Sequence, residues 1–220
     1  PDGFIYIAAL CAGVLLFHGG TGKAGRVELM KLFLRAGLVC TVVYLPWFAG
    51  AWAYYGSPVP HTVVAKGNAV GDRSLWEAVL TWLSLPWSGW KGLACLGALD
   101  GLFMPSGHCC GGWPEPLLRL TRFLAGMAAV VWLLPKVSRE TRVVAFALSI
   151  LLAYLGYFPG TGVAGWYLPG PAWMALFAFA GVLSRGLNSP WKWARRLAFA
   201  AGLAWCGLSV WLLVEVTRLS

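Results

Sequence analysis

The chain has 220 residues, of which 59% are apolar and 11% charged, and its mean hydropathy is +0.70. Soluble domains carry about 25% charged and about 45–50% apolar residues, so this composition excludes an ordinary soluble enzyme fold and indicates an integral membrane protein. The net charge of +9 would favour nucleic acid in a soluble chain. Here basic residues that flank membrane spans account for the charge, and we expect no nucleic-acid partner.

Six apolar stretches are long enough to cross a bilayer, which takes about 20 residues with a range of about 17–25. In chain order they cover residues 4–20, 36–53, 117–135, 143–159, 163–183 and 197–214. We therefore predict an all-α fold, a polytopic transmembrane helical bundle of about six membrane helices. The chain starts at Pro1 and shows neither a basic n-region nor a cleavage site, so residues 1–220 are expected to be a single transmembrane domain cut from a longer protein.

The distribution of Lys and Arg predicts the orientation of these spans. Segments 23–35, 136–142 and 185–196 hold 4, 3 and 4 of the 17 basic residues, whereas the short connection 160–162 holds none. Under the positive-inside rule the three basic segments face the cytoplasm. Residues 54–116, the connection 160–162 and the C-terminus then face outside, in a chain expected in the bacterial cytoplasmic membrane.

The outer segment 54–116 contains a second kind of helix. Ser74 and Glu77 have the spacing of a capping box, with Ser at the N-cap and Glu at N3. Apolar residues on one helical face follow, and Pro86 ends the pattern. About ten residues cannot span a bilayer, so we predict an amphipathic helix that lies in the outer interface.

Two motifs that could bind a cofactor or metal are set aside. Residues 20–25 and 160–165 match G-x-G-x-x-G, but neither follows a strand, which phosphate binding by that motif requires. Cys95, His108, Cys109 and Cys110 lack the spacing of a zinc site. The sequence therefore identifies no metal site and no cofactor.

The segment that follows the second span carries the most specific pattern. Gly56 allows the chain to turn sharply, and Pro58 and Pro60 stiffen the exit. His61, Thr62 and Lys66 then offer an imidazole, a hydroxyl and a cation at headgroup depth, which suits a ligand with a phosphate. The alternative is an interfacial belt with a snorkelling lysine.

The string YYGSPVPHTVVAK, residues 54–66, resembles the YYG-x-P-x-P-N-T-x-x-A-K signature of bacterial GT-C membrane glycosyltransferases. That group includes the terminal arabinofuranosyltransferases of mycobacterial type and related proteins of the mannosyltransferase-like superfamily. His61 stands where the signature commonly has Asn. Trp166 and Tyr167, followed by Pro169, resemble the WY-x-x-P pattern found where a later span begins at the outer face.

The resemblance implies a membrane glycosyltransferase that moves a sugar from a polyprenyl-phosphate donor to an acceptor at the outer face of the cytoplasmic membrane. It places Lys66 at the donor phosphate, where a cation would stabilise the leaving group, and it gives Tyr55 and Trp166 a sugar or lipid to contact. The expected substrate-binding residues are Tyr55, Gly56, Pro58, Pro60, His61, Thr62, Lys66, Trp166 and Tyr167. In that family an aspartate of the first outer loop usually serves as base or metal ligand. This chain shows no such loop, so no catalytic residue is assigned and the metal requirement stays open.

Two other functions fit a polytopic chain with these features. One is a transporter or flippase for a lipid-linked sugar, although such proteins usually carry ionisable groups near the bilayer midplane. The predicted spans hold almost no charge at their centres. The other is a membrane scaffold without enzymatic activity, but a scaffold role would not explain the pattern of residues 54–66.

Overall fold

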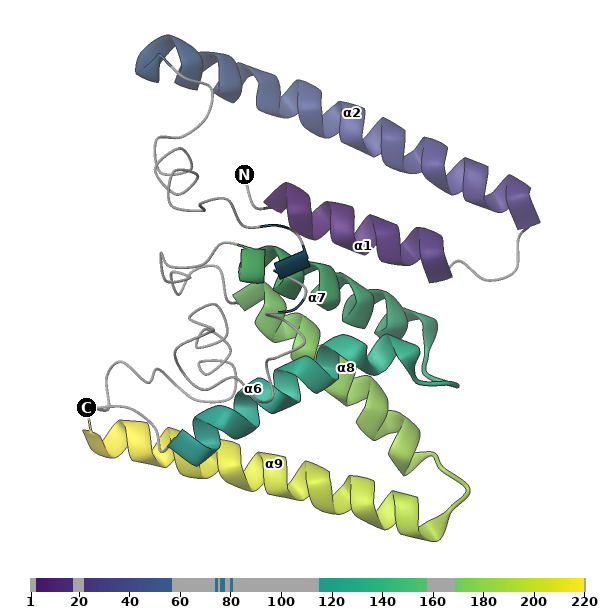
Figure 1. The fold of residues 1–220 in the computed structure, drawn as a ribbon, viewed down its shortest axis with the longest axis vertical. Coiled ribbons are helices and arrows are strands. Elements are labelled where there is room, and N and C mark those ends of the chain that lie inside the picture. Colours follow the sequence, from purple (N-terminus) through teal and green to yellow (C-terminus); the bar gives the residue numbers. More distant parts are fainter. Residues whose placement is uncertain are drawn as a thin grey trace.

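A computed structural model describes residues 3–17, 22–56, 74, 76–77, 80, 115–157 and 169–219. Within these residues the fold is all-α, as predicted, and contains no strand. The helices are α1 (Gly3–Phe17), α2 (Gly22–Tyr55), α6 (Glu115–Val130), α7 (Arg139–Tyr157), α8 (Pro169–Leu187) and α9 (Lys192–Leu219). A short 3-10 helix, η2 (Val131–Leu133), continues α6 (Figure 1).

Each of the six predicted spans falls on one of these helices, but the bounds differ. α2 begins at Gly22 and is 34 residues long, so the basic segment 23–35 is helical and continuous with the apolar stretch that follows it. The five charged residues of that segment, four basic and one acidic, do not interrupt the helix, because Lys, Arg and Glu are good helix formers. The predicted third span ends earlier than residue 135, at the turn after η2. Residues 158–168, which include the predicted hairpin at 160–162 and the start of the fifth span, lie outside the described residues.

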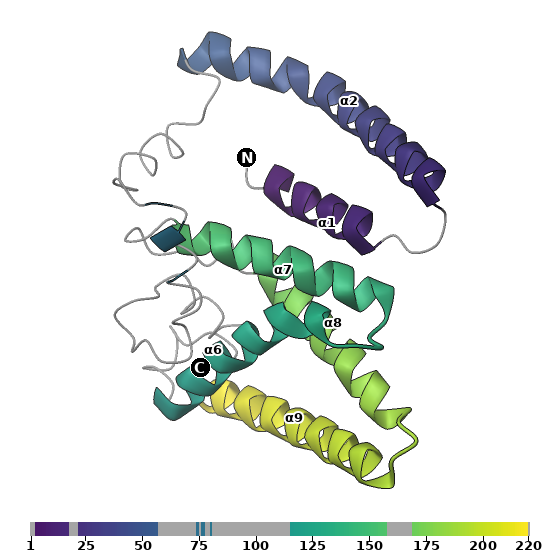
Figure 2. The same ribbon diagram turned by 45° about the vertical axis from the view of Figure 1, so that its right-hand side comes forward.

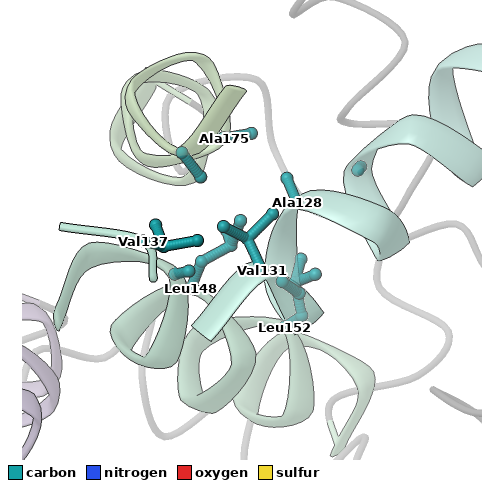
Figure 3. Close-up of a cluster of buried hydrophobic side chains, with 10 residues drawn as sticks. Ala128, Val131, Val137, Leu148, Leu152 and Ala175 are labelled. Atoms are coloured by element: carbon teal, nitrogen blue, oxygen red, sulfur yellow. The ribbon is translucent and has the colours of Figure 1, made fainter. Parts of the chain in front are cut away.

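The densest core lies where α6, η2, α7 and α8 meet. Its buried members are mostly alanines, joined by a few larger aliphatic side chains, namely Val131, Val137, Leu148 and Leu152 (Figure 3). Ala175 of α8 and Ala128 of α6 lie above Val131 and Leu148 in this view. Small residues at helix contacts let backbones approach closely, which is how helices pack when lipid removes the hydrophobic driving force between them.

Glycines make the closest helix contacts. A Cβ at Gly13 of α1 would lie 2.9 Å from the carbonyl oxygen of Val143 in α7. A Cβ at Gly181 of α8 would lie 2.6 Å from Cγ2 and 2.9 Å from Cβ of Thr141 in α7. Thr141 is buried, and its Oγ1 lies 2.9 Å from Oγ of Ser138, the residue that caps α7. α7 is therefore the central helix, and α1 and α8 can approach it this closely only because these two positions lack a side chain.

A polar contact joins α6 to α7 inside this assembly. Trp132 Nε1 donates to Ser149 Oγ at 3.1 Å, and Ser149 Oγ lies 2.5 Å from the carbonyl oxygen of Ala129 and 3.2 Å from that of Ala145. The Ser149 hydroxyl has one proton, so it donates to one of these carbonyls while it accepts from the indole. The contact fixes the end of η2 against α7.

α2 lies apart from the core. It contacts α1, the helix nearest to it (Figure 2). Gly25, Leu29 and Phe33 are half-buried, whereas residues 34–50 are all exposed. Among the described residues one helix, Gly25–Tyr55, is long and apolar enough to cross a membrane, and none of its apolar window is buried. Its exposed side chains include Leu34, Val39, Val43 and Trp52. A helix that is apolar all round and uncovered by protein requires an apolar surrounding.

The helices alternate in direction, so that the connections fall on two sides of the molecule. The start of α2, the α6–α7 turn and the α8–α9 connection, which carry the three basic segments, all lie on the right-hand side in both views (Figures 1 and 2). α2, α7 and α9 end on the opposite side. Segments that are far apart in sequence thus gather 11 of the 17 Lys and Arg residues toward one end of the helices.

Candidate functional site

The predicted site begins where α2 ends, and the structure describes this first part. Gly56 has a φ of +69°, and its N–H donates to the carbonyl oxygen of Trp52 at 2.9 Å. This is the αL C-cap, in which the residue after the helix adopts left-handed geometry and its N–H bonds four residues back. The prediction that Gly56 turns the chain sharply at the end of the second span is confirmed.

Aromatic side chains surround this helix end. Tyr54 and Tyr55 pack edge to face, with ring centroids 4.7 Å apart and an interplanar angle of 81°. They are 81% and 61% exposed, and Trp52 one turn earlier is also exposed. Residues 36–55 contain no charged side chain and would rise about 30 Å in a helix, which matches the hydrocarbon core. Exposed Trp and Tyr rings at the end of an apolar stretch of this length are typical of interfacial belts.

The remaining predicted site residues lie outside the described residues. They are Pro58, Pro60, His61, Thr62, Lys66, Trp166 and Tyr167. Tyr55 and Gly56 are therefore the two members of the set whose positions are known, and whether the set converges stays a prediction.

The predicted capping box at the start of the interfacial helix is confirmed. The Ser74 N–H donates to Glu77 Oε2 at 3.0 Å, and the Glu77 N–H donates to Ser74 Oγ at 3.2 Å. These are the two reciprocal bonds of the motif. Trp76, Glu77 and Leu80 are helical, and Trp76 is exposed. The other residues of the predicted helix lie outside the described residues.

A second cluster, absent from the sequence-based prediction, lies at the other end of the helices. Phe17 of α1, Trp132 of η2 and Phe146 of α7 pack against one another, with centroid distances between 5.4 and 6.2 Å. Arg142 lies over this cluster, its Cζ 6.0 Å from the centroid of the Phe17 ring. Its Nη2 donates to the carbonyl oxygen of Leu134 at 3.1 Å. No local pattern predicts this group, because its members come from three elements and meet only after the helices pack.

The helix end beside this cluster carries a perturbed carboxyl. Glu140 lies in the first turn of α7 and is fully exposed. The pKa of Glu140 is lowered, first by a hydrogen bond from its own backbone N–H, then by the Ser138 side chain and by the charge of Arg139. The first-turn position favours the ionised form in the same direction, since the helix dipole is positive there.

No constellation for metal binding is present in the part of the chain that the structure describes, where no three His, Cys, Asp or Glu side chains gather. Cys11, Cys40 and Cys206 carry free thiols. Comparison with protein-family models, with curated proteins and with solved structures finds no match for this chain.

Proposed function

We propose that this chain is a multi-pass membrane protein whose helices α1, α2, α6, α7, α8 and α9 all cross the bilayer. The basic segments 23–35, 136–142 and 185–196 would lie on the cytoplasmic side. Three observations support the proposal. Each predicted span falls on a helix. The three basic segments lie on one side of the molecule (Figures 1 and 2). The apolar side chains of α2 are not covered by other helices. The cytoplasmic membrane of a bacterium remains the expected location.

We further propose that the protein is a GT-C type glycosyltransferase that uses a polyprenyl-phosphate sugar donor at the outer face. The observation that carries this proposal is the left-handed Gly56 at the end of an uncovered apolar helix. A chain that leaves the helix at that point enters the headgroup region directly, and the next ten residues are those that resemble the family signature. Their hydroxyl, imidazole and ammonium groups would then meet a lipid phosphate at its own depth.

The chemistry required of this segment is charge stabilisation. Transfer of the sugar leaves negative charge on the polyprenyl phosphate, and a fixed cation in a poorly hydrated site stabilises that charge most strongly. Lys66 is the proposed cation, and no residue of this chain is proposed as the base that activates the acceptor. Tyr55 is positioned at the rim of the segment, where its ring can contact the sugar or the prenyl chain.

Lys66→Ala in the full-length protein tests this proposal. A charge-assisted contact contributes about 1.5–3 kcal/mol, so sugar transfer in reconstituted membranes should fall about ten- to 150-fold while membrane insertion is retained. Lys192→Ala, which removes a lysine from the opposite side, is the matched control and should transfer sugar at the rate of the unmodified protein. Unchanged transfer by Lys66→Ala would reduce Lys66 to an interfacial anchor.

The same preparation separates the two other candidate functions. Movement of the lipid-linked sugar across the bilayer, with no sugar transferred to any acceptor, would identify a transporter and refute the proposed enzyme. Absence of both transfer and movement in the full-length protein would leave a scaffold.

A further inference from the structure

The turn between η2 and α7 combines positive charge with exposed apolar side chains. Lys136, Arg139 and Arg142 lie within seven residues, with Glu140 as the acidic residue among them. Leu133 and Leu134, which precede them, are 62% and 40% exposed. These five residues, Leu133, Leu134, Lys136, Arg139 and Arg142, form what we call the α6–α7 turn surface. Leucines beside cations are typical of a surface that contacts both acyl chains and headgroups.

Arg142 is the fixed part of this surface. The guanidinium is half-buried, lies over the Phe17 ring and donates from Nη2 to the carbonyl oxygen of Leu134. Its Nε is buried and has no hydrogen-bond partner. Among the described residues no carboxylate lies within ion-pair distance of Arg142. The one ion pair found among these residues joins Lys31 and Glu28. The charge is thus held in place by an aromatic ring and a backbone carbonyl, and it is not neutralised by an acid.

Lys136 is held at the tip of the same turn. It has a φ of +60°, a left-handed geometry that a non-glycine residue adopts at a cost. Its side chain is exposed. A lysine in a position that favours glycine keeps its charge at the tip of the turn at the expense of local stability. A strained position of this kind motivates the hypothesis that the cation has a function.

The location of the surface identifies the partner. The α6–α7 turn lies on the same side as the start of α2 and the α8–α9 connection, which carry the two other basic segments (Figures 1 and 2). In a membrane protein this side meets the leaflet that carries anionic lipids, where each Lys or Arg near the surface contributes about 1 kcal/mol of attraction. A phosphodiester beside Arg142 would accept hydrogen bonds from a guanidinium fork that is already oriented.

We propose that the α6–α7 turn surface binds the phosphate of an anionic membrane phospholipid, with Leu133 and Leu134 against its acyl chains. The site lies at the end of the molecule opposite Gly56. The inference rests on the membrane placement proposed above and is independent of sugar transfer. The negative charge of the lipid phosphate would also balance the positive charge of Arg142.

The test measures phosphatidylglycerol binding to the purified full-length protein in phosphatidylcholine nanodiscs or detergent, by native mass spectrometry. Lys136→Gly should weaken binding about fivefold, which corresponds to about 1 kcal/mol at 1.4 kcal/mol per decade. Glycine suits the φ of this position, so the turn is expected to keep its fold. Arg142→Lys keeps the charge but loses the planar fork, and a similar weakening would support direct contact with the guanidinium.

Arg195→Gln is the matched control, because it removes one exposed positive charge from the first turn of α9, which begins on the same side of the molecule. It should bind phosphatidylglycerol as the unmodified protein does. Equal weakening by Arg195→Gln and Lys136→Gly would overturn the proposal, since it would show general attraction between charges and no specific site. Equally strong binding of phosphatidylcholine, or full displacement of the lipid by inorganic phosphate, would also overturn it.

Discussion

Replacing Gly181 by alanine tests the close packing of α8 on α7. The added Cβ would lie 2.6 Å from Thr141 Cγ2 and 2.9 Å from Thr141 Cβ, and Thr141 cannot simply move aside because its Oγ1 contacts Ser138 Oγ. Overpacking of this kind costs about 1–3 kcal/mol. Alanine also gains about 1 kcal/mol of helix propensity over glycine, so the raw change in stability mixes two effects of opposite sign.

A second glycine separates the two effects. A Cβ at Gly207, inside α9, would meet nothing within 4 Å, so Gly207→Ala reports the propensity gain alone. We expect Gly181→Ala to be about 1–3 kcal/mol less stable than Gly207→Ala, measured by denaturant or thermal unfolding of the protein in detergent.

A double variant then assigns the penalty to Thr141. Thr141→Ala removes Oγ1 and Cγ2, the two threonine atoms nearest to the new methyl group, so it should recover part of the loss when combined with Gly181→Ala. Contacting residues show coupling energies of about 0.5–3 kcal/mol in such cycles. Equal stabilities for the two single glycine variants, or no coupling with Thr141→Ala, would refute the packing described for α7 and α8.

Three further outcomes follow from local geometry. Gly56→Ala forces a left-handed alanine, which costs about 1–2 kcal/mol, so hydrogen exchange in the last turn of α2 should become faster while the middle of the helix is unaffected. Ser74→Ala removes one bond of the capping box and should lower protection at Glu77 by about 0.5–2 kcal/mol, and unchanged exchange would mean that the cap contributes nothing. Glu140 has a folded-state pKa below the ordinary value of 4.5, so its contribution to stability is present above about pH 4.5 and is lost as pH falls through the lower, folded-state pKa. Glu140→Gln should make stability less dependent on pH below about pH 4.5. Identical profiles of stability against pH for both proteins would contradict the lowered pKa of Glu140.

The helices were predictable because the information for each is local. Runs of uncharged apolar residues between basic segments placed every span on a helix, and the spacing of Ser74 and Glu77 predicted both bonds of their capping box. Gly56 was predictable for the same reason, since a glycine after a long apolar run commonly takes the left-handed position. The boundaries were less accurate, as at the start of α2, because charged residues that are good helix formers extend a helix beyond its membrane-crossing part.

The amino-acid sequence by itself determined that the chain is helical and apolar and that its basic residues alternate along it, because hydropathy, capping and charge act over one or a few turns. Only the tertiary structure decided that α7 is the central helix, that Gly181 faces Thr141 and that Arg142 lies over Phe17. Arg142 and Phe17 are 125 residues apart, and their contact depends on how closely small residues let α1 approach α7. The spacing of residues within one segment does not predict how closely α1 approaches α7. That distance is set by the side chains of both helices together.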